Sequence, residues 1–139
     1  MQRVISILMV EDDPLDVMDI KRTLDKQSIL YKMHVAHNGE EALDILNHTE
    51  QHFGRLPDIV LIDINMPRMN GLELLHVIRN NDEWKRLKCF IITSSDENVD
   101  RQAARSLNVS GYIIKPFKMN NPSSVDSFNL MIDLMNMKE

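Results

Sequence analysis

Short runs of apolar residues alternate along this chain with longer segments whose apolar residues recur every three or four positions. The short runs are Val4–Val10, Ile59–Ile62, Cys89–Ile92 and Tyr112–Ile114. Nearly continuous apolar runs of this length predict β-strands that are covered on both faces. A further segment, in which Met33 and Val35 alternate with polar neighbours, predicts an edge strand.

A segment with helical spacing follows each predicted strand. The apolar positions of these segments are, in chain order, Val17, Ile20 and Leu24; Ala42, Ile45 and Leu46; Leu74, Leu75 and Ile78; Val99, Ala103 and Leu107; and Val125, Phe128, Ile132 and Met135. Asp13 before Pro14 predicts the start of the first helix. Asn38 with Glu41 three residues later resembles a capping box at the start of the second. The polar stretch Asn47–Pro57 is predicted as a loop.

Strands that alternate with helices indicate a parallel sheet with helices on both faces. Right-handed crossovers limit its topology. Five strands fit a flavodoxin-like, doubly wound (βα)5 sheet with strand order 2-1-3-4-5, in which the first and third strands flank the ligand-binding switch point. A chain of 139 residues without repeats or linkers suits a single domain.

Composition excludes several classes of function. The net charge is −5 and no run is rich in lysine or arginine, which argues against direct binding of nucleic acid. The apolar runs are far shorter than a membrane span, and the N-terminus lacks a signal-peptide cleavage site. Cys89 is the only cysteine, which excludes an intrachain disulfide, and its apolar neighbours predict a buried, unreactive thiol. These features predict a cytoplasmic protein with no membrane partner.

Polar side chains stand where four of the predicted strands end. They are Glu11, Asp12 and Asp13 after the first strand, Asp63 after the third, Thr93 after the fourth and Lys115 after the fifth. Because parallel strands present their carboxyl ends at one edge of the sheet, we expect these groups to meet there. The result is a cluster of carboxylates with one hydroxyl and one ammonium group.

This cluster predicts phosphoryl chemistry. Crowded carboxylates repel one another unless a cation intervenes, and oxygen ligands together with a phosphate oxygen favour Mg²⁺. Asp63 is the candidate nucleophile, since an aspartate can form an aspartyl-phosphate. Mg²⁺ and Lys115 would neutralise the phosphoryl oxygens, and the Thr93 hydroxyl could donate a hydrogen bond to one of them.

The sequence resembles the receiver domains of two-component response regulators. The segments that carry the resemblance are residues 7–13 (ILMVEDD), 58–71 (DIVLIDINMPRMNG), 91–95 (IITSS) and 111–117 (GYIIKPF). They occur in order and extend, with the intervening pattern, from Val4 to Phe117. The resemblance implies a stand-alone, CheY-like receiver over residues 1–139 without an output domain, similar to those that partner bacterial phytochrome kinases.

The resemblance also implies a role for individual residues. It makes Asp63 the phosphoacceptor, Lys115 the phosphate-binding lysine, Thr93 the switch hydroxyl and Tyr112 the switch aromatic residue. It assigns the metal to Asp12, Glu11 and Asp63, with the backbone carbonyl of Asn65, and it implies a cis peptide bond at Pro116. The expected function is a signalling phosphoacceptor that is modified by a histidine kinase or phosphotransfer protein, not an enzyme.

Two enzyme or cofactor-binding alternatives share parts of this pattern. A phosphatase of the haloacid dehalogenase type would need a second aspartate two residues after Asp63, where this chain has Asn65. A flavodoxin would cradle a phosphate at the loop where Glu11, Asp12 and Asp13 would repel it.

The expected output surface consists of the helix around Ala103, the strand Tyr112–Ile114 and the final helix. These elements flank Thr93 and Tyr112, and the final helix carries Met131, Met135 and Met137, a residue type that adapts to partners. We therefore expect a possible homodimer through this surface, in which the same patch pairs with itself.

Overall fold

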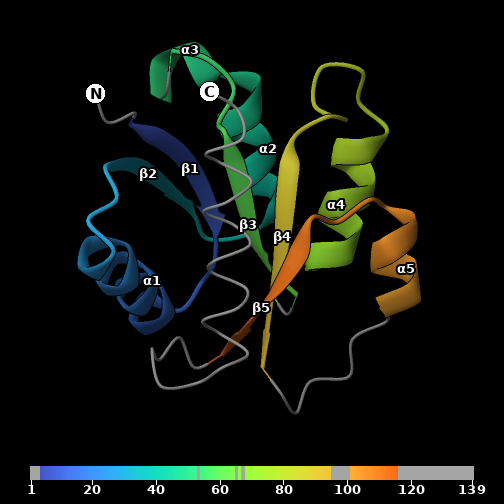
Figure 1. The fold of residues 1–139 in the computed structure, drawn as a ribbon. Coiled ribbons are helices and arrows are strands. Elements are labelled where there is room, and N and C mark those ends of the chain that lie inside the picture. Colours follow the sequence, from blue (N-terminus) through green and yellow to red (C-terminus); the bar gives the residue numbers. More distant parts are fainter. Residues whose placement is uncertain (1–3, 53, 65, 67, 95–100, 116–139) are drawn as a thin grey trace.

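A five-stranded parallel sheet with strand order β2-β1-β3-β4-β5 forms the centre of the molecule (Figure 1). The computed structural model describes residues 4–52, 54–64, 66, 68–94 and 101–115. The strands are β1 (Ile5–Val10), β2 (Tyr31–Ala36), β3 (Ile59–Asp63), β4 (Lys88–Ser94) and β5 (Gly111–Lys115). The helices are α1 (Pro14–Lys26), α2 (Gly39–Asn47), α3 (Thr49–His52), α4 (Gly71–Arg79) and α5 (Arg101–Ser106). The predicted flavodoxin-like topology is confirmed.

Alternate residues of the central strands are buried on opposite faces of the sheet. On one face Ile7, Met9 and their counterparts in β3 and β4 pack against Val17, Ile20 and Leu24 of α1. On the other face Leu8, Val10 and their counterparts pack against the buried residues of α2 and α4. Two apolar layers therefore enclose the sheet, which explains why β1 and β3 are almost entirely apolar.

The helix starts follow the predicted capping chemistry with one difference. Asp13 caps α1 by accepting the backbone N–H of Leu15 at 2.9 Å. Asn38 caps α2 by accepting the N–H of Glu41 at 2.8 Å. The Glu41 carboxylate, however, contacts Nδ1 of His37 at 2.9 Å, so the capping box predicted at α2 is wrong in its second half. The imidazole directly before the cap offers that carboxylate a charged partner when it is protonated.

Several predicted details differ from the structure, besides β3, β4 and β5 extending one or two residues beyond their predicted ends. Val4 is exposed and lies before β1. The stretch Asn47–Pro57, predicted as a loop, contains the single turn of α3. In α5 the fully buried residue is Ala104, whereas Ala103 and Leu107 are half-buried. Leu107 packs from beyond the helix because α5 ends at Ser106 and the chain turns at Asn108, where φ is +56°. Val99 and the final predicted helix lie outside the described residues.

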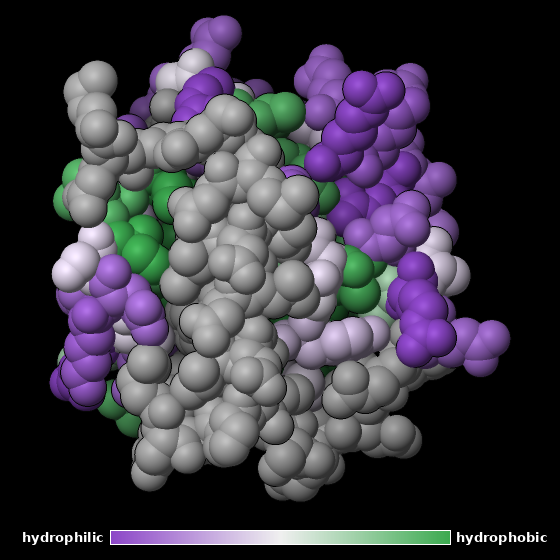
Figure 2. All heavy atoms as spheres, viewed as in Figure 1, coloured by the Kyte–Doolittle hydropathy of each residue, from purple (hydrophilic) through white to green (hydrophobic). Residues whose placement is uncertain are grey.

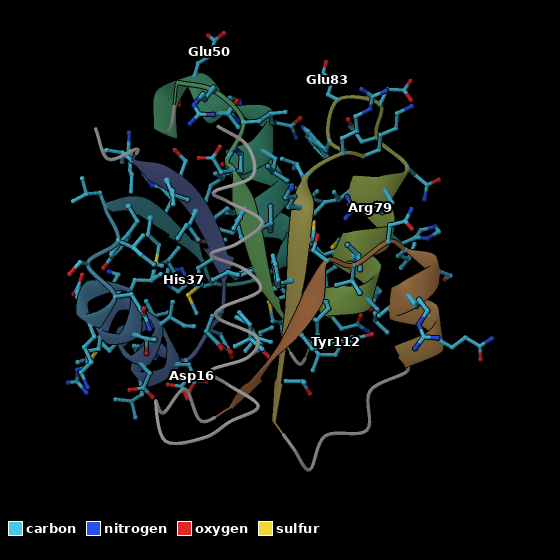
Figure 3. All side chains as sticks on the ribbon, viewed as in Figure 1. Asp16, His37, Glu50, Arg79, Glu83 and Tyr112 are labelled. Carbon is cyan, nitrogen blue, oxygen red and sulfur yellow. The ribbon has the colours of Figure 1, made fainter. Side chains whose placement is uncertain are left out.

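The amino-terminal ends of the strands are held by two arginines. Before β3, both guanidinium NH2 groups of Arg55 donate to the buried carboxylate of Asp58 at 3.2 Å, and this carboxylate also accepts the Ser6 N–H. At the end of α4, Arg79 donates to the carbonyls of Lys85 and Leu87 before β4, and of Leu107 and Asn108 before β5. Arg79 thereby joins one helix to the loops that lead into two strands (Figure 3).

The segment between α4 and β4 presents a strongly hydrophilic surface, in the upper right of Figure 2. Within this segment, Trp84 is buried and belongs to the core on the α2 and α4 face of the sheet. Cys89 in β4 is fully buried, and this burial raises the pKa of its thiol to about 11, which confirms the expected unreactive thiol.

In the described part of the chain, every helix is too short or too polar to cross a membrane.

Candidate functional site

Three carboxylates meet at the carboxyl edge of the sheet. Oxygen atoms of Glu11, Asp12 and Asp63 all lie within 4.8 Å of one another. Glu11 is only 1% exposed and Asp63 only 3%, whereas Asp12 faces solvent. The predicted meeting of the acids after β1 with the acid at the end of β3 is therefore present.

The backbone holds these acids in place. Glu11 follows β1, and its N–H donates to the Ala36 carbonyl at 2.9 Å, so the β1–β2 ladder continues one residue past the strand. The Glu11 carboxylate accepts the Asp13 N–H at 3.3 Å. Asp63 is the last residue of β3, and the next residue, Ile64, donates to the Ile92 carbonyl at 3.0 Å. Rigid strands on both sides thus fix the distance between Glu11 and Asp63.

The donor set fits a hard divalent cation. Two of the three carboxylates are buried, and charged groups of one sign are costly to bury side by side unless a positive charge or a proton compensates. Carboxylate oxygens are the ligands that Mg²⁺ and Mn²⁺ prefer over softer donors. Glu11, Asp12 and Asp63 are the residues that would hold such an ion, with the exposed Asp12 on the solvent side.

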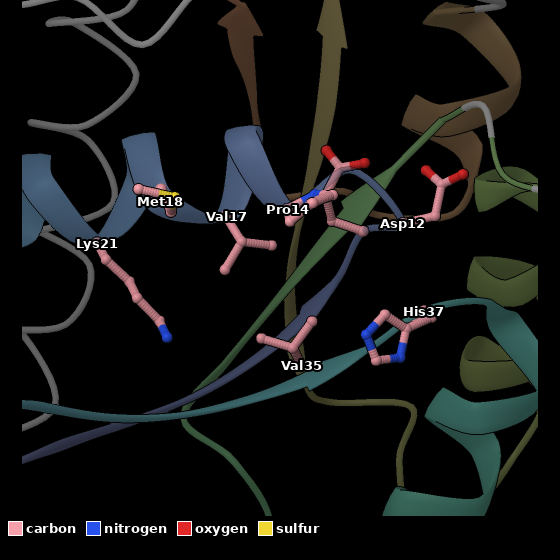
Figure 4. Close-up of a pocket in the computed structure, with 8 residues that line it drawn as sticks. Asp12, Pro14, Val17, Met18, Lys21, Val35 and His37 are labelled. Atoms are coloured by element: carbon pink, nitrogen blue, oxygen red, sulfur yellow. The ribbon is translucent and has the colours of Figure 1, made fainter.

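A cavity of about 540 Å³ opens beside the acids, between α1 and the end of β2. Its lining residues are Glu11, Asp12, Pro14, Val17, Met18, Lys21, Val35 and His37. Val17 and Val35 form apolar walls, with the Asp12 carboxylate towards one end and Lys21 towards the other (Figure 4). The cavity therefore borders two of the three acids, Glu11 and Asp12, on the α1 side.

The predicted switch residues lie on the two strands that follow the acids. Thr93 on β4 is 1% exposed, one residue beyond Ile92, which is the register partner of Asp63. Tyr112 on β5 pairs with Ile91 and lies on the side of the sheet that faces α4 (Figure 3). It is half-buried and packs against the same core as Leu107 and Val109.

The remaining predicted site residues are placed only in part. The backbone of Lys115 ends β5 opposite Ser94, so it stands at the same edge of the sheet as the acids. Asn65 and Pro116 lie outside the described residues, and so do Met131, Met135 and Met137.

Sequence reasoning missed a contact beside the site. Gly39, the first residue of α2, lies against Met69 in the loop between β3 and α4. Arg68 of the same loop donates to the Glu40 carboxylate at 3.2 Å. No periodicity or motif pairs residues 39–40 with residues 68–69. The single available signal was a glycine at a helical position where alanine is the better helix former.

The chain is similar to proteins of one family. The family model for the response regulator receiver domain matches residues 7–123. This chain belongs to the response regulator receiver domain family. The predicted receiver domain is thereby confirmed, and the acids of the site occupy the carboxyl edge of a receiver fold.

Named relatives agree with this assignment. The probable methanogenesis regulatory protein FilR2 of Methanothrix harundinacea is 31% identical over 110 residues, which cover 79% of this chain and 71% of the relative. Response regulator Rcp1 of Synechocystis is 29% identical over 78% of this chain and 75% of its own length, and a Mn²⁺-bound structure of Rcp1 matches with a TM-score of 0.76. The bacteriophytochrome response regulator AtBRR superimposes with a TM-score of 0.75 at 30% identity, covering 96% of this chain and 91% of AtBRR. These similarities confirm the resemblance to response regulators.

Proposed function

We propose that this receiver domain accepts a phosphoryl group on Asp63 from a histidine kinase or a phosphotransfer protein, with Mg²⁺ at the site. The observation that carries the proposal is the position of Asp63: it ends the central strand, with oxygens of Glu11 and Asp12 within 4.8 Å. In the Mn²⁺-bound structure of Rcp1, a protein with the same fold binds a divalent metal ion. The protein is a cytoplasmic signalling phosphoacceptor, and the sole reactions that it promotes are its own phosphorylation and dephosphorylation.

The transfer is an in-line displacement. A carboxylate oxygen of Asp63 forms a bond to phosphorus, while the bond from phosphorus to the histidine nitrogen of the donor breaks and that nitrogen keeps the electron pair. A bound Mg²⁺ supplies neutralisation of the charge on the phosphoryl oxygens. Glu11 and Asp12, together with Asp63, would hold the ion, and the burial of Asp63 excludes most water from the nucleophile. Lys115 would supply a second positive charge next to the phosphoryl oxygens.

Phosphorylation with acetyl phosphate and Mg²⁺ tests the assignment. We expect one hydroxylamine-labile phosphoryl group per chain, and we expect Asp63→Asn to abolish it. Asp58→Asn is the matched control, because Asp58 is also buried but lies at the opposite end of β3. Labelling of Asp63→Asn at the wild-type level would refute the proposal, whereas Asp58→Asn should keep its labelling.

The proposal includes a switch through Thr93 and Tyr112. A phosphoryl oxygen on Asp63 offers the Thr93 hydroxyl a new acceptor, and a shift of Thr93 towards Asp63 opens space for Tyr112. The surface of α5 and β5, together with the final helix, then changes its affinity for a partner, including a second copy of the chain. Thr93→Ala should accept the phosphoryl group but lose the phosphorylation-dependent change in self-association, as measured by light scattering. An equal change in Thr93→Ala and wild type would exclude Thr93 as the switch.

A further inference from the structure

The start of α2 contacts the loop that follows Asp63, and it follows the strand that is hydrogen-bonded to the segment after β1. On one side it follows β2, whose last residue, Ala36, accepts the Glu11 N–H at 2.9 Å. On the other side Gly39 and Glu40 contact Met69 and Arg68 of the loop that follows Asp63. The end of β2 and the first turn of α2 together therefore connect the segment after β1 to the segment after β3.

The contact between Gly39 and Met69 leaves no room for a side chain at position 39. A β-carbon on Gly39 would lie 2.7 Å from Sδ, 2.8 Å from Cβ and 2.9 Å from Cγ of Met69. All three separations are shorter than a carbon contact allows. Gly39 is not among the glycines with positive φ, so its backbone does not require glycine. The close approach of Met69 is therefore the reason for the glycine, at a position where alanine would favour the helix.

The same loop returns to the phosphoacceptor itself. The Gly71 N–H donates to the Ile64 carbonyl at 3.1 Å, which closes the loop beside Asp63. A β-carbon on Gly71 would lie 2.5 Å from the Asp63 carbonyl oxygen. Between these ends, Met69 packs against the core and Arg68 has a φ of +70°. Because Cβ of Met69 is among the atoms that a β-carbon on Gly39 would meet, rotation of the Met69 side chain alone does not relieve the contact, and the backbone of a loop held at Gly71 must shift as well.

We propose that Gly39 and Met69 are positioning residues for the carboxylate cluster: their contact sets the Asp63 backbone relative to Glu11. The inference rests on the proposed function, since it concerns the geometry in which the cluster takes Mg²⁺ and the phosphoryl group. The Arg68–Glu40 ion pair adds a weaker tie, because both side chains are more than half exposed, at 65% and 61%.

Magnesium affinity is the decisive measurement, taken by calorimetric titration of the unphosphorylated protein. Gly39→Ala should weaken Mg²⁺ binding by about 10-fold or more, the effect typical of residues that orient metal ligands. Its phosphorylation by acetyl phosphate at limiting Mg²⁺ should slow by a similar factor. In the second-site variant Gly39→Ala/Met69→Gly the colliding atoms are absent, so its Mg²⁺ affinity should match that of Met69→Gly alone, in which the contact is likewise lost.

Gly54→Ala is the matched control. Gly54 has a φ of +78°, and a β-carbon added there would have no atom within 4 Å, so the substitution strains the backbone without touching another group. It should lower stability while leaving Mg²⁺ affinity unchanged. This control separates a loss of positioning from a general loss of stability.

The outcomes distinguish the two proposals. If wild type neither binds Mg²⁺ nor becomes phosphorylated, the proposed function is wrong, and this inference with it. If wild type does both and Gly39→Ala matches it, only the positioning role is refuted. Should Gly39→Ala fail to fold, Met69→Ala decides: it keeps Gly39 but removes Sδ and Cγ, and an unchanged Mg²⁺ affinity would overturn the inference.

Discussion

The two edges of the sheet use charge in opposite ways. At the amino edge, the buried Asp58 accepts hydrogen bonds from the exposed Arg55 guanidinium and from the Ser6 N–H, and Arg79 donates to four backbone carbonyls. At the carboxyl edge, carboxylates gather around one another. The amino edge satisfies its charges within the protein and so contributes stability. The carboxyl edge brings three carboxylates together, which is the arrangement expected of a site that takes up a cation and a phosphoryl group.

The largest effect is expected from the amino edge. Arg79→Ala removes four hydrogen bonds to carbonyls before β4 and β5 and should lower the free energy of unfolding by about 2–4 kcal/mol. Urea denaturation measures the loss. Arg79→Lys is the control and should recover only part of it, because one ammonium cannot reproduce the planar guanidinium fork. A loss below about 0.5 kcal/mol would show that the hydrogen bonds of Arg79 do not stabilise the fold.

The buried thiol of Cys89, beside Arg79, should make the free energy of unfolding depend on pH. Burial raises the pKa of Cys89 from 9.0 to about 11, against an opposing contribution from Arg79. The folded protein therefore holds the thiol proton more tightly than the unfolded chain does. The contribution of the protonated thiol to the free energy of unfolding is complete below pH 9. It is lost as the pH rises towards 11, and the free energy of unfolding then falls by at most about 1.4 kcal/mol per pH unit.

Unfolding free energies of wild type and Cys89→Ala between pH 8 and about 11 isolate this contribution from the titration of lysines and tyrosines. The variant should lack the additional slope. Parallel pH profiles for the two proteins would mean that the thiol titrates alike in the folded and unfolded states.

At the carboxyl edge, removal of a charged side chain should raise the free energy of unfolding and not lower it. In the absence of divalent metal, Asp12→Ala removes an exposed negative charge from beside Glu11 and Asp63. It should raise stability by a few tenths of a kcal/mol, up to about 1 kcal/mol. Mg²⁺ at about ten times its dissociation constant should stabilise wild type by about 1.4 kcal/mol, and the variant by much less. Thermal denaturation with and without Mg²⁺ measures both effects, and destabilisation by Asp12→Ala without metal would contradict the contrast between the edges.

The sequence predicted the acidic site because its residues follow strands that apolar runs define. Val10 and Ile62 are register partners in adjacent parallel strands, so the acids one residue later necessarily come close. The strand order, the α1 cap at Asp13 and the buried helix positions of α1, α2 and α4 were likewise predictable, because each depends on local periodicity or on neighbouring residues.

Other features depended on contacts that spacing along the chain does not decide. The carboxylate of Glu41 turns to His37 and not to the Asn38 N–H, a choice between two neighbours that spacing alone does not decide. The burial of Ala104 in place of Ala103 follows from where α5 ends and how the chain turns at Asn108. The role of Arg79 likewise depends on the loops before β4 and β5, whose carbonyls accept its hydrogen bonds.

The sequence by itself thus determined the sheet, the acids at its carboxyl edge and their chemistry. Side chains in a strand alternate between the two faces with a fixed period, so the pattern of apolar residues specifies the strand register. The register in turn fixes which residues stand at the ends of neighbouring strands. The tertiary structure alone decided which groups brace those acids, namely the contact of Gly39 with Met69 and the return of Gly71 to Asp63. Such contacts depend on how closely two segments approach each other, and no periodic pattern in the sequence encodes that distance.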